Sequence, residues 1–150
     1  MSAELASRIG TERVPGALAL LLTLKGTPTL YYGDELGLPD APVDAGRARD
    51  CAELRSRLSR VRELLKLRRE PAALRQGDIT VLSAHPDHLA YLRGDGEDSL
   101  VVAVNLSGRD QRVAFPGVRS TLWSSSFTGG ERDRLPGEVT LAPFEARLLR

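Results

Sequence analysis

Pro71 divides the sequence into two parts whose apolar residues follow different periods. Before Pro71, apolar side chains recur at three- and four-residue spacings, which are typical of helices. After it, they fall in short alternating runs bounded by turn residues, which are typical of strands. Proline cannot continue a helix interior, so the change of pattern marks a boundary. The sequence therefore predicts an α+β fold, with a helical part over residues 1–75 and an all-β antiparallel sandwich over residues 76–150.

The second part contains short candidate strands at the spacing expected of an antiparallel sandwich. They are residues 79–83, 89–93, 100–106, 111–114, 120–124, 139–141 and 146–149. Asp95-Gly96 lies between the second and third of these runs and is a strong hairpin signal. The third run is apolar over residues 100–104, so we expect it to be the central strand, buried on both faces.

A leucine-rich helix followed by a short strand is predicted before residue 33. Residues 13–24 are apolar on nearly every side, which favours a helix buried on most faces, and Gly26 ends it. Residues 28–32 then form a short strand, with Pro28 at its start, where the missing N–H costs least. Such a helix and strand are half of a βαβ unit, which needs a neighbouring strand reached through a crossover. No second strand of this kind follows, so we expect the chain to be incomplete at its N-terminus.

A second helix is predicted over residues 50–69, with Asp50 as its N-cap. Its apolar residues recur at a four, three, four spacing from Leu54 to Leu65, and its other face is rich in arginine. The formal net charge of the whole chain is only +1. We therefore interpret the basic face as a solvated surface with ion pairs along the helix, in preference to a nucleic-acid or phosphate surface.

The sequence does not favour a disulfide, a metal site or a membrane partner. Cys51 is the single cysteine, and with His85 and His88 it leaves no zinc-ligand spacing. The run His85-Pro86-Asp87-His88 is explained by a turn between two strands. The apolar run at residues 17–24 is far shorter than the roughly 20 residues that cross a bilayer. We expect a cytoplasmic protein with no cofactor, no metal, no nucleic acid and no membrane partner.

Asp34 and Glu35 are adjacent acids that follow the predicted strand, where barrel enzymes place their functional groups. A retaining glycosidase needs two carboxyl groups about 5 to 5.5 Å apart on opposite sides of the bond that is cleaved. Adjacent residues usually project in different directions. We therefore expect these acids to cap the following turn or to hold neighbouring loops, and we assign no catalytic and no substrate-binding residue.

Trp123 and Phe127 flank a serine-rich bend, and two interpretations of them stay open. They form an exposed aromatic platform for a sugar ring, or they plug one end of the sandwich. Aromatic residues are only 5% of the chain, so a core has few to use and we favour the structural role. Ser124, Ser125 and Ser126 have no nearby base, so nucleophilic catalysis is not predicted.

Residues 21–37, LLTLKGTPTLYYGDELG, resemble the last barrel strand of the α-amylase family, glycoside hydrolase family thirteen. The motif residues that match have a structural role in the family, in the wall beneath the active site: Gly26, Pro28, Tyr31, Tyr32, Gly33, Asp34 and Glu35. The likeness is greatest to the α-glucosidase and oligo-1,6-glucosidase branch, and it covers nearly the whole chain. Further matching segments are residues 6–10, 64–78, 89–96, 100–107 and 141–149.

The resemblance implies that residues 1–75 are the remnant of a (β/α)8 TIM barrel, with the last strand at about 28–32 and the final helix at about 50–69. Residues 76–150 would be the family's C-terminal β-sandwich domain. Members cleave or transfer α-linked glucosyl units with an Asp nucleophile, a Glu acid/base and a second Asp on earlier strands, and none of those positions exists in this sequence. Between Leu36 and Asp50 the chain also lacks the Pro-Met-Gln-Trp-like segment that contributes to substrate subsites in this branch.

Two functional hypotheses follow from the resemblance. The first is a C-terminal fragment of an α-glucosidase-like or α-amylase-like hydrolase of carbohydrate metabolism, inactive alone. The second is a sugar-binding or assembly module that completes a separately encoded barrel, with that barrel portion or an α-glucan oligosaccharide as its partner. The second is motivated by the apolar surface that helix 13–24 would expose without a barrel.

Overall fold

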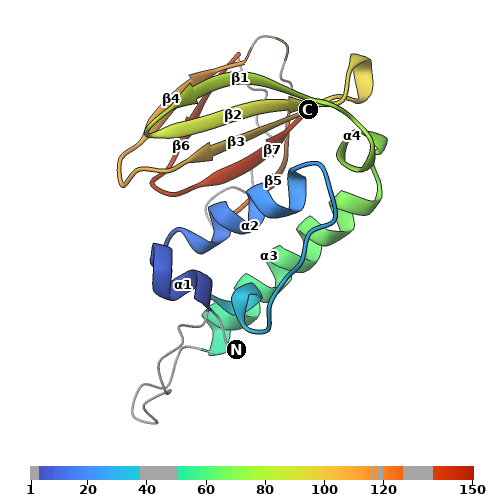
Figure 1. The fold of residues 1–150 in the computed structure, drawn as a ribbon. Helices are drawn as coiled ribbons and strands as arrows, with labels where there is room; N and C mark the ends of the chain where they lie inside the picture. The colour runs from blue at the N-terminus through green and yellow to red at the C-terminus, as the bar shows by residue number, and fades with distance from the viewer. Residues whose placement is uncertain (1–3, 38–50, 116, 118–119, 127–136) are drawn as a thin grey trace.

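The computed structural model describes residues 4–37, 51–115, 117, 120–126 and 137–150 (Figure 1). Its helices and short 3-10 turns are α1 (Glu4–Ile9), α2 (Val14–Thr23), η1 (Asp34–Leu36), α3 (Cys51–Arg69), α4 (Ala72–Arg75) and η2 (Gly96–Asp98). Its strands are β1 (Ile79–His85), β2 (His88–Arg93), β3 (Leu100–Asn105), β4 (Gln111–Ala114), β5 (Thr121–Ser124), β6 (Glu138–Leu141) and β7 (Ala146–Leu149). Helices therefore precede strands along the chain, which confirms the predicted order.

All seven predicted strands are present, and every strand pair is antiparallel. Five form one sheet in the order β1-β2-β3-β7-β5, and β4 pairs with β6 in a separate two-stranded sheet. The predicted bounds hold within two residues: β1 continues to His85, and β3 ends at Asn105. The predicted central strand is β3, which lies in the middle of the larger sheet.

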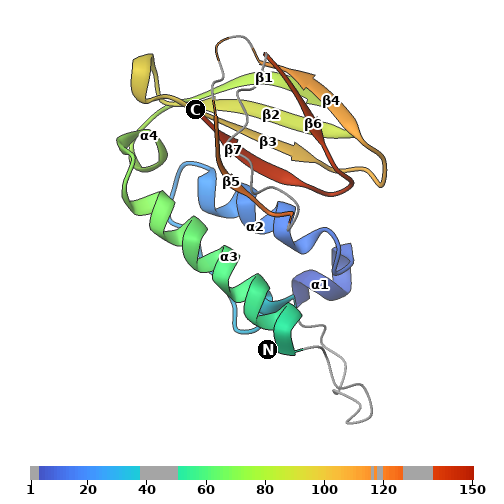
Figure 2. The same cartoon turned by 180° about the vertical axis from the view of Figure 1, so that it is seen from behind.

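The side chains of β3 alternate between two apolar clusters, as the period of a strand requires. Leu100, Val102 and Val104 face a cluster that includes α2 and α3, whereas Val101 and Ala103 face a cluster shared with β4 and β6. Figure 2 shows the helices on one side of the larger sheet, with β4 and β6 away from them. The α+β class is confirmed, with helices packed on one face of the sheet and two strands on the other.

The predicted strand at residues 28–32 is not formed. Residues 27–31 have no regular secondary structure, and Tyr32 and Gly33 lie in a turn that leads into η1. A parallel strand exists only through hydrogen bonds to a neighbouring strand, and no described strand lies beside this segment. Tyr31 and Tyr32 are 58% and 86% exposed, so the segment lies on the surface of the described molecule.

The predicted second helix is confirmed as α3, which ends at Arg69. Asp50, its predicted N-cap, and the loop before it fall in residues 38–50, outside the described residues. Pro71 precedes α4 with φ −74°, so the long helix stops where expected. Helices and sheet share one apolar cluster, and the division into domains at residue 75 stays a prediction. Among the described helices, none has the length and hydropathy needed to span a bilayer.

Candidate functional site

The motif at residues 26–37 forms a tight turn around its two acids. Gly33 has φ 93°, in the left-handed region that glycine adopts without strain. Oε2 of Glu35 accepts a hydrogen bond from the Gly33 N–H at 3.0 Å, so this carboxylate closes the turn. Asp34 is 8% exposed, and its buried Oδ1 has no hydrogen-bond partner among the described residues. The two neighbouring acids therefore occupy different environments.

Arg68 of α3 holds the end of α2, directly before this motif. Its Nη1 donates to the carbonyls of Leu22 at 2.6 Å and Leu24 at 3.1 Å, and its Nη2 donates to the carbonyl of Gly26 at 2.5 Å. The last carbonyls of a helix have no partner inside the helix and lie at the negative end of its dipole. The Arg68 guanidinium thus anchors the motif to α3.

Arg93 of β2 binds the same helix end from the sheet. Its side chain is fully buried. Nη1 donates to the Thr23 carbonyl at 2.5 Å, and Nη2 donates to the carbonyls of Ala73 at 3.0 Å and Leu74 at 3.1 Å. Burial lowers the pKa of Arg93 from its usual value. One guanidinium therefore joins α2, α4 and β2.

A hydroxyl pair lies next to Arg93. Thr23 Oγ1 donates to the Ala19 carbonyl, and the Tyr91 hydroxyl is 2.7 Å from Thr23 Oγ1. Because the one proton of Thr23 is already used, Tyr91 must donate to it. Burial raises the pKa of the Tyr91 phenol, and the hydrogen bond that the phenol donates exists only in its neutral form. The phenol is therefore held in its neutral form.

Trp123 is 5% exposed and packs in the cluster between the sheet and the helices. Its Nε1 donates to the backbone carbonyl of Arg60 on α3 at 3.1 Å. The platform interpretation is wrong for Trp123, because an indole stacked under a sugar ring must expose one face. Trp123 therefore has a structural role, in which its ring joins β5 to α3. Phe127 lies outside the described residues.

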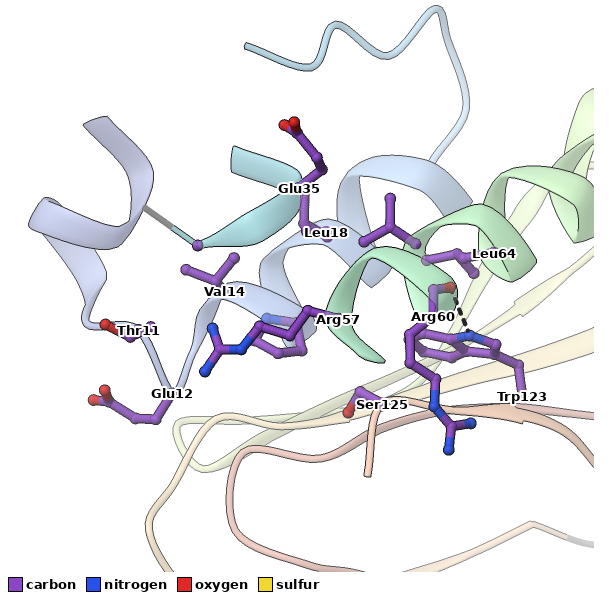
Figure 3. Close-up of a pocket in the computed structure, with 13 residues that line it drawn as sticks. Thr11, Glu12, Val14, Leu18, Glu35, Arg57, Arg60, Leu64, Trp123 and Ser125 are labelled. Atoms are coloured by element: carbon purple, nitrogen blue, oxygen red, sulfur yellow. Dashed lines mark hydrogen bonds between the residues drawn. The ribbon is translucent and has the colours of Figure 1, made fainter. Parts of the chain in front are cut away.

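A cleft of about 110 Å³ opens beside Trp123 (Figure 3). Its lining comes from α2, η1, α3 and β5, and the apolar part includes Val14, Leu18, Val61, Leu64 and Trp123. Arg57 at its rim already pairs with Glu53 at 2.7 Å. Figure 3 shows the Glu35 carboxylate directed away from Arg57 and Arg60. The cleft thus has an apolar wall, and Glu12, Glu35, Arg57 and Arg60 also belong to its lining.

The histidine run forms the turn between β1 and β2. The His85 and His88 rings stack with centroids 5.3 Å apart, and His88 Nε2 is 2.8 Å from Ser83 Oγ. The N–H of Asp87 donates to His85 Nδ1 at 3.2 Å. In the part of the chain that the structure describes, no group of three or more His, Cys, Asp or Glu side chains could hold a metal ion. These residues belong to the hairpin.

Buried Asn105 was not singled out by sequence reasoning. It is 1% exposed, and its Nδ2 donates to the carbonyls of Arg109 at 2.7 Å and Ala142 at 2.8 Å. Its Oδ1 accepts from the Ser107 N–H at 2.9 Å. An Asn that ends an apolar strand before Ser and Gly is a turn signal, and that signal could have located it.

Buried Glu145 was also missed. It is 2% exposed and accepts hydrogen bonds from Ser124 Oγ at 2.6 Å and from the Ala142 N–H at 2.8 Å. Arg147 pairs with it at 2.7 Å. Ser124, in the serine run, therefore donates a hydrogen bond to the buried Glu145 carboxylate. Nothing in the spacing of these residues along the sequence indicates that contact.

The sequence is similar to one described protein family and to parts of longer proteins. A family described as "Domain of unknown function (DUF3459)" matches residues 75–143. The chain is 29% identical to a cyclomaltodextrinase of Geobacillus thermopakistaniensis over 82% of its own length and 22% of that protein's. It is 33% identical to the mouse amino acid transporter heavy chain SLC3A2 over 87% of its length and 33% of that protein's. The chain thus spans a third or less of these relatives.

The fold also recurs in a solved structure. The trehalulose synthase MutB from Pseudomonas mesoacidophila MX-45 superposes on 96% of this chain and 40% of the MutB chain, with a TM-score of 0.74 and 16% identity. The architecture is therefore that of the C-terminal portion of the MutB chain. The chain belongs to the α-amylase family, glycoside hydrolase family thirteen, and corresponds to its C-terminal region.

Proposed function

We propose that this chain supplies the C-terminal part of an α-glucan-processing protein, in which it completes a catalytic barrel and contributes no catalytic acid of its own. The name of the cyclomaltodextrinase relative supports the substrate class. The structural use of Glu35 and of Trp123 supports the non-catalytic role, because these side chains are already engaged with backbone groups.

The observation that carries the proposal is the surface at residues 27–34, where exposed side chains lie beside a buried acceptor that has no partner among the described residues. Residues 27–31 have no regular structure, and Tyr32 is 86% exposed. Leu24 is 40% exposed at the end of α2. Asp34 keeps a buried carboxylate oxygen without a partner among the described residues. Exposed apolar groups beside an unused buried acceptor are expected where another part of a protein packs.

The proposal is tested by measuring hydrogen exchange of this chain with and without an added barrel. The barrel is taken from the cyclomaltodextrinase relative, truncated before the region that is similar to this chain. The backbone amides of residues 29–32 should exchange rapidly in this chain alone and become protected when the barrel portion is added. Tyr32→Asp should remove that protection, because it places a charge in the contact. Leu106→Asp is the matched control, since Leu106 is 40% exposed on another part of the surface. Unchanged exchange at residues 29–32 would contradict the proposal.

A second candidate is an assembly module in a protein without glycosidase activity. The similarity to a transporter heavy chain favours it, because that name describes a subunit of a larger assembly. The two candidates differ in their dependence on sugar. In the assembly role, association with a partner should be indifferent to added maltooligosaccharide, whereas in the first role the completed barrel should bind it. Calorimetric titration of the reconstituted complex with maltotriose separates them.

A further inference from the structure

Among the described residues, β1 is one of the two edge strands of the larger sheet. β1 pairs with β2 along one side only, and in the described parts of the chain no strand pairs with its other side. A free edge presents a row of unpaired N–H and C=O groups, which is a template for another strand. This edge is distinct from the surface at residues 27–34 that carries the proposed function.

The side chains of β1 leave this edge unusually apolar. Ile79, Val81 and Leu82 are 37%, 60% and 46% exposed. From Ile79 to Ala84 the strand has no charged residue and no proline, although soluble proteins commonly protect an edge with such residues. The single protective feature is a bulge at Leu82, between Val81 and Ser83. The opposite edge strand, β5, has only four residues, and very short edge strands offer little template for pairing.

We propose that β1 pairs antiparallel with β1 of a second copy of this chain, about a two-fold axis near Val81. In that arrangement Val81 lies opposite its own copy, and these two apolar side chains meet at the axis. Backbone hydrogen bonds then join the two sheets into one continuous sheet.

The charges at the two ends of β1 favour this occupant. Lys25 and Asp78 form an exposed ion pair of 2.7 Å at the start of the strand. Asp87 and Arg109 lie 3.6 Å apart beyond its end. Antiparallel pairing brings the start of one strand beside the end of the other. The Lys25–Asp78 pair of one copy then lies towards the Asp87–Arg109 pair of the other, and each cation can approach an anion of the partner. A single strand pair is smaller than the roughly 1,600 Å² of a standard interface, so the association is expected to be weak and concentration-dependent.

Sedimentation velocity over a wide concentration range tests the pairing. The apparent mass of the wild-type chain should rise from monomer towards dimer with concentration. Val81→Lys should weaken the dimer by about tenfold or more, because like charges would face each other across the axis. Leu122→Lys and Tyr32→Lys should dimerise like wild type, since both side chains are exposed and neither residue lies on β1 or beside the charged groups at its ends. Circular dichroism of each variant verifies that the fold is retained.

Cross-linking gives the position of the axis. In a Cys51→Ala background, Val81→Cys should form a disulfide-linked dimer under mild oxidation, because residues opposite each other across strands fall within the Cα separation that a disulfide accepts. Leu106→Cys in the same background should remain monomeric. A chain that is monomeric at every concentration would overturn the proposal and leave the edge to an extended peptide of another protein. Equal dimerisation of wild type and Val81→Lys would overturn it as well.

Discussion

At the scale of single residues, a buried arginine holds helices to the sheet, a role that sequence patterns normally assign to apolar side chains. The Arg93 guanidinium has three backbone carbonyls as its hydrogen-bond partners in the described structure, and its Nε has none. These carbonyls end α2 and belong to α4, so they carry the negative ends of helices. The charge of Arg93 is therefore balanced by peptide dipoles, and the side chain fixes the helices to the sheet.

Replacing Arg93 should be costly. Arg93→Met keeps an elongated apolar side chain but removes the Arg93 donor from the Thr23 and Leu74 carbonyls, while the Ala73 carbonyl keeps the Gly77 N–H at 3.1 Å. We expect it to lower the free energy of unfolding by about 3 kcal/mol. Arg112→Met is the matched control, because the Arg112 side chain is 79% exposed, and it should change stability by less than about 0.5 kcal/mol. Urea denaturation measures both. Equal losses in the two variants would contradict the role given to Arg93.

Tyr91 should make stability fall at alkaline pH. Its pKa in the folded state is raised above the usual value by burial. A raised folded pKa contributes stability that is fully present below the unfolded pKa of about 10 and is lost as pH rises through the folded pKa. In denaturant titrations from pH 8 to 11, Tyr91→Phe should show a shallower loss of stability than wild type. Tyr32→Phe should follow the wild-type curve, and identical slopes for wild type and Tyr91→Phe would refute the assignment.

At the scale of elements, the turn between β6 and β7 combines a strained backbone at Phe144 with a contact between the Phe144 ring and Arg13. Phe144 has φ 58°, in the region that glycine prefers, and it follows Pro143 in a turn closed by the Glu145 N–H and the Ala142 carbonyl at 3.0 Å. The Arg13 guanidinium lies 4.8 Å from the centre of its ring. The ring therefore connects this turn to the residue before α2.

Two substitutions separate the strain at Phe144 from its contact. Phe144→Ala and Phe144→Gly both remove the ring, but only glycine also relieves the left-handed backbone. Phe144→Gly should therefore be more stable than Phe144→Ala by about 1 kcal/mol, as measured by thermal unfolding. Equal stability, or a more stable alanine variant, would show that this turn stores no strain.

The docking of β5 on α3 depends on Trp123. Trp123→Ala should destabilise the chain by about 3 to 5 kcal/mol through the cavity it leaves. Trp123→Phe keeps most of the ring volume and loses the N–H bond to the Arg60 carbonyl, so it should lose less stability than Trp123→Ala. Chemical denaturation followed by far-ultraviolet circular dichroism gives both values. A Trp123→Ala variant as stable as wild type would contradict the burial of this ring.

At the scale of the whole molecule, a structural feature can be predicted from the sequence when the residues that cause it lie close together in the chain. The strands were predictable because alternation and turn residues lie within each segment, as in Leu100–Asn105. Residues 28–32 have the composition of a strand, but a strand needs a neighbour, which no local pattern reports. Arg93 was missed because arginine is normally exposed, and its carbonyl partners come from elements far apart in the sequence. Trp123 stayed open because composition does not tell a buried ring from an exposed one.

The most direct test of the account is a hydrolysis assay of the purified chain with 4-nitrophenyl α-glucoside, maltose and a cyclomaltodextrin. The account predicts no turnover above the buffer rate, because Glu35 closes a backbone turn and Asp34 is buried apart from the cleft beside Trp123. Turnover by the wild-type chain that Asp34→Asn or Glu35→Gln abolishes, with the fold intact, would contradict it.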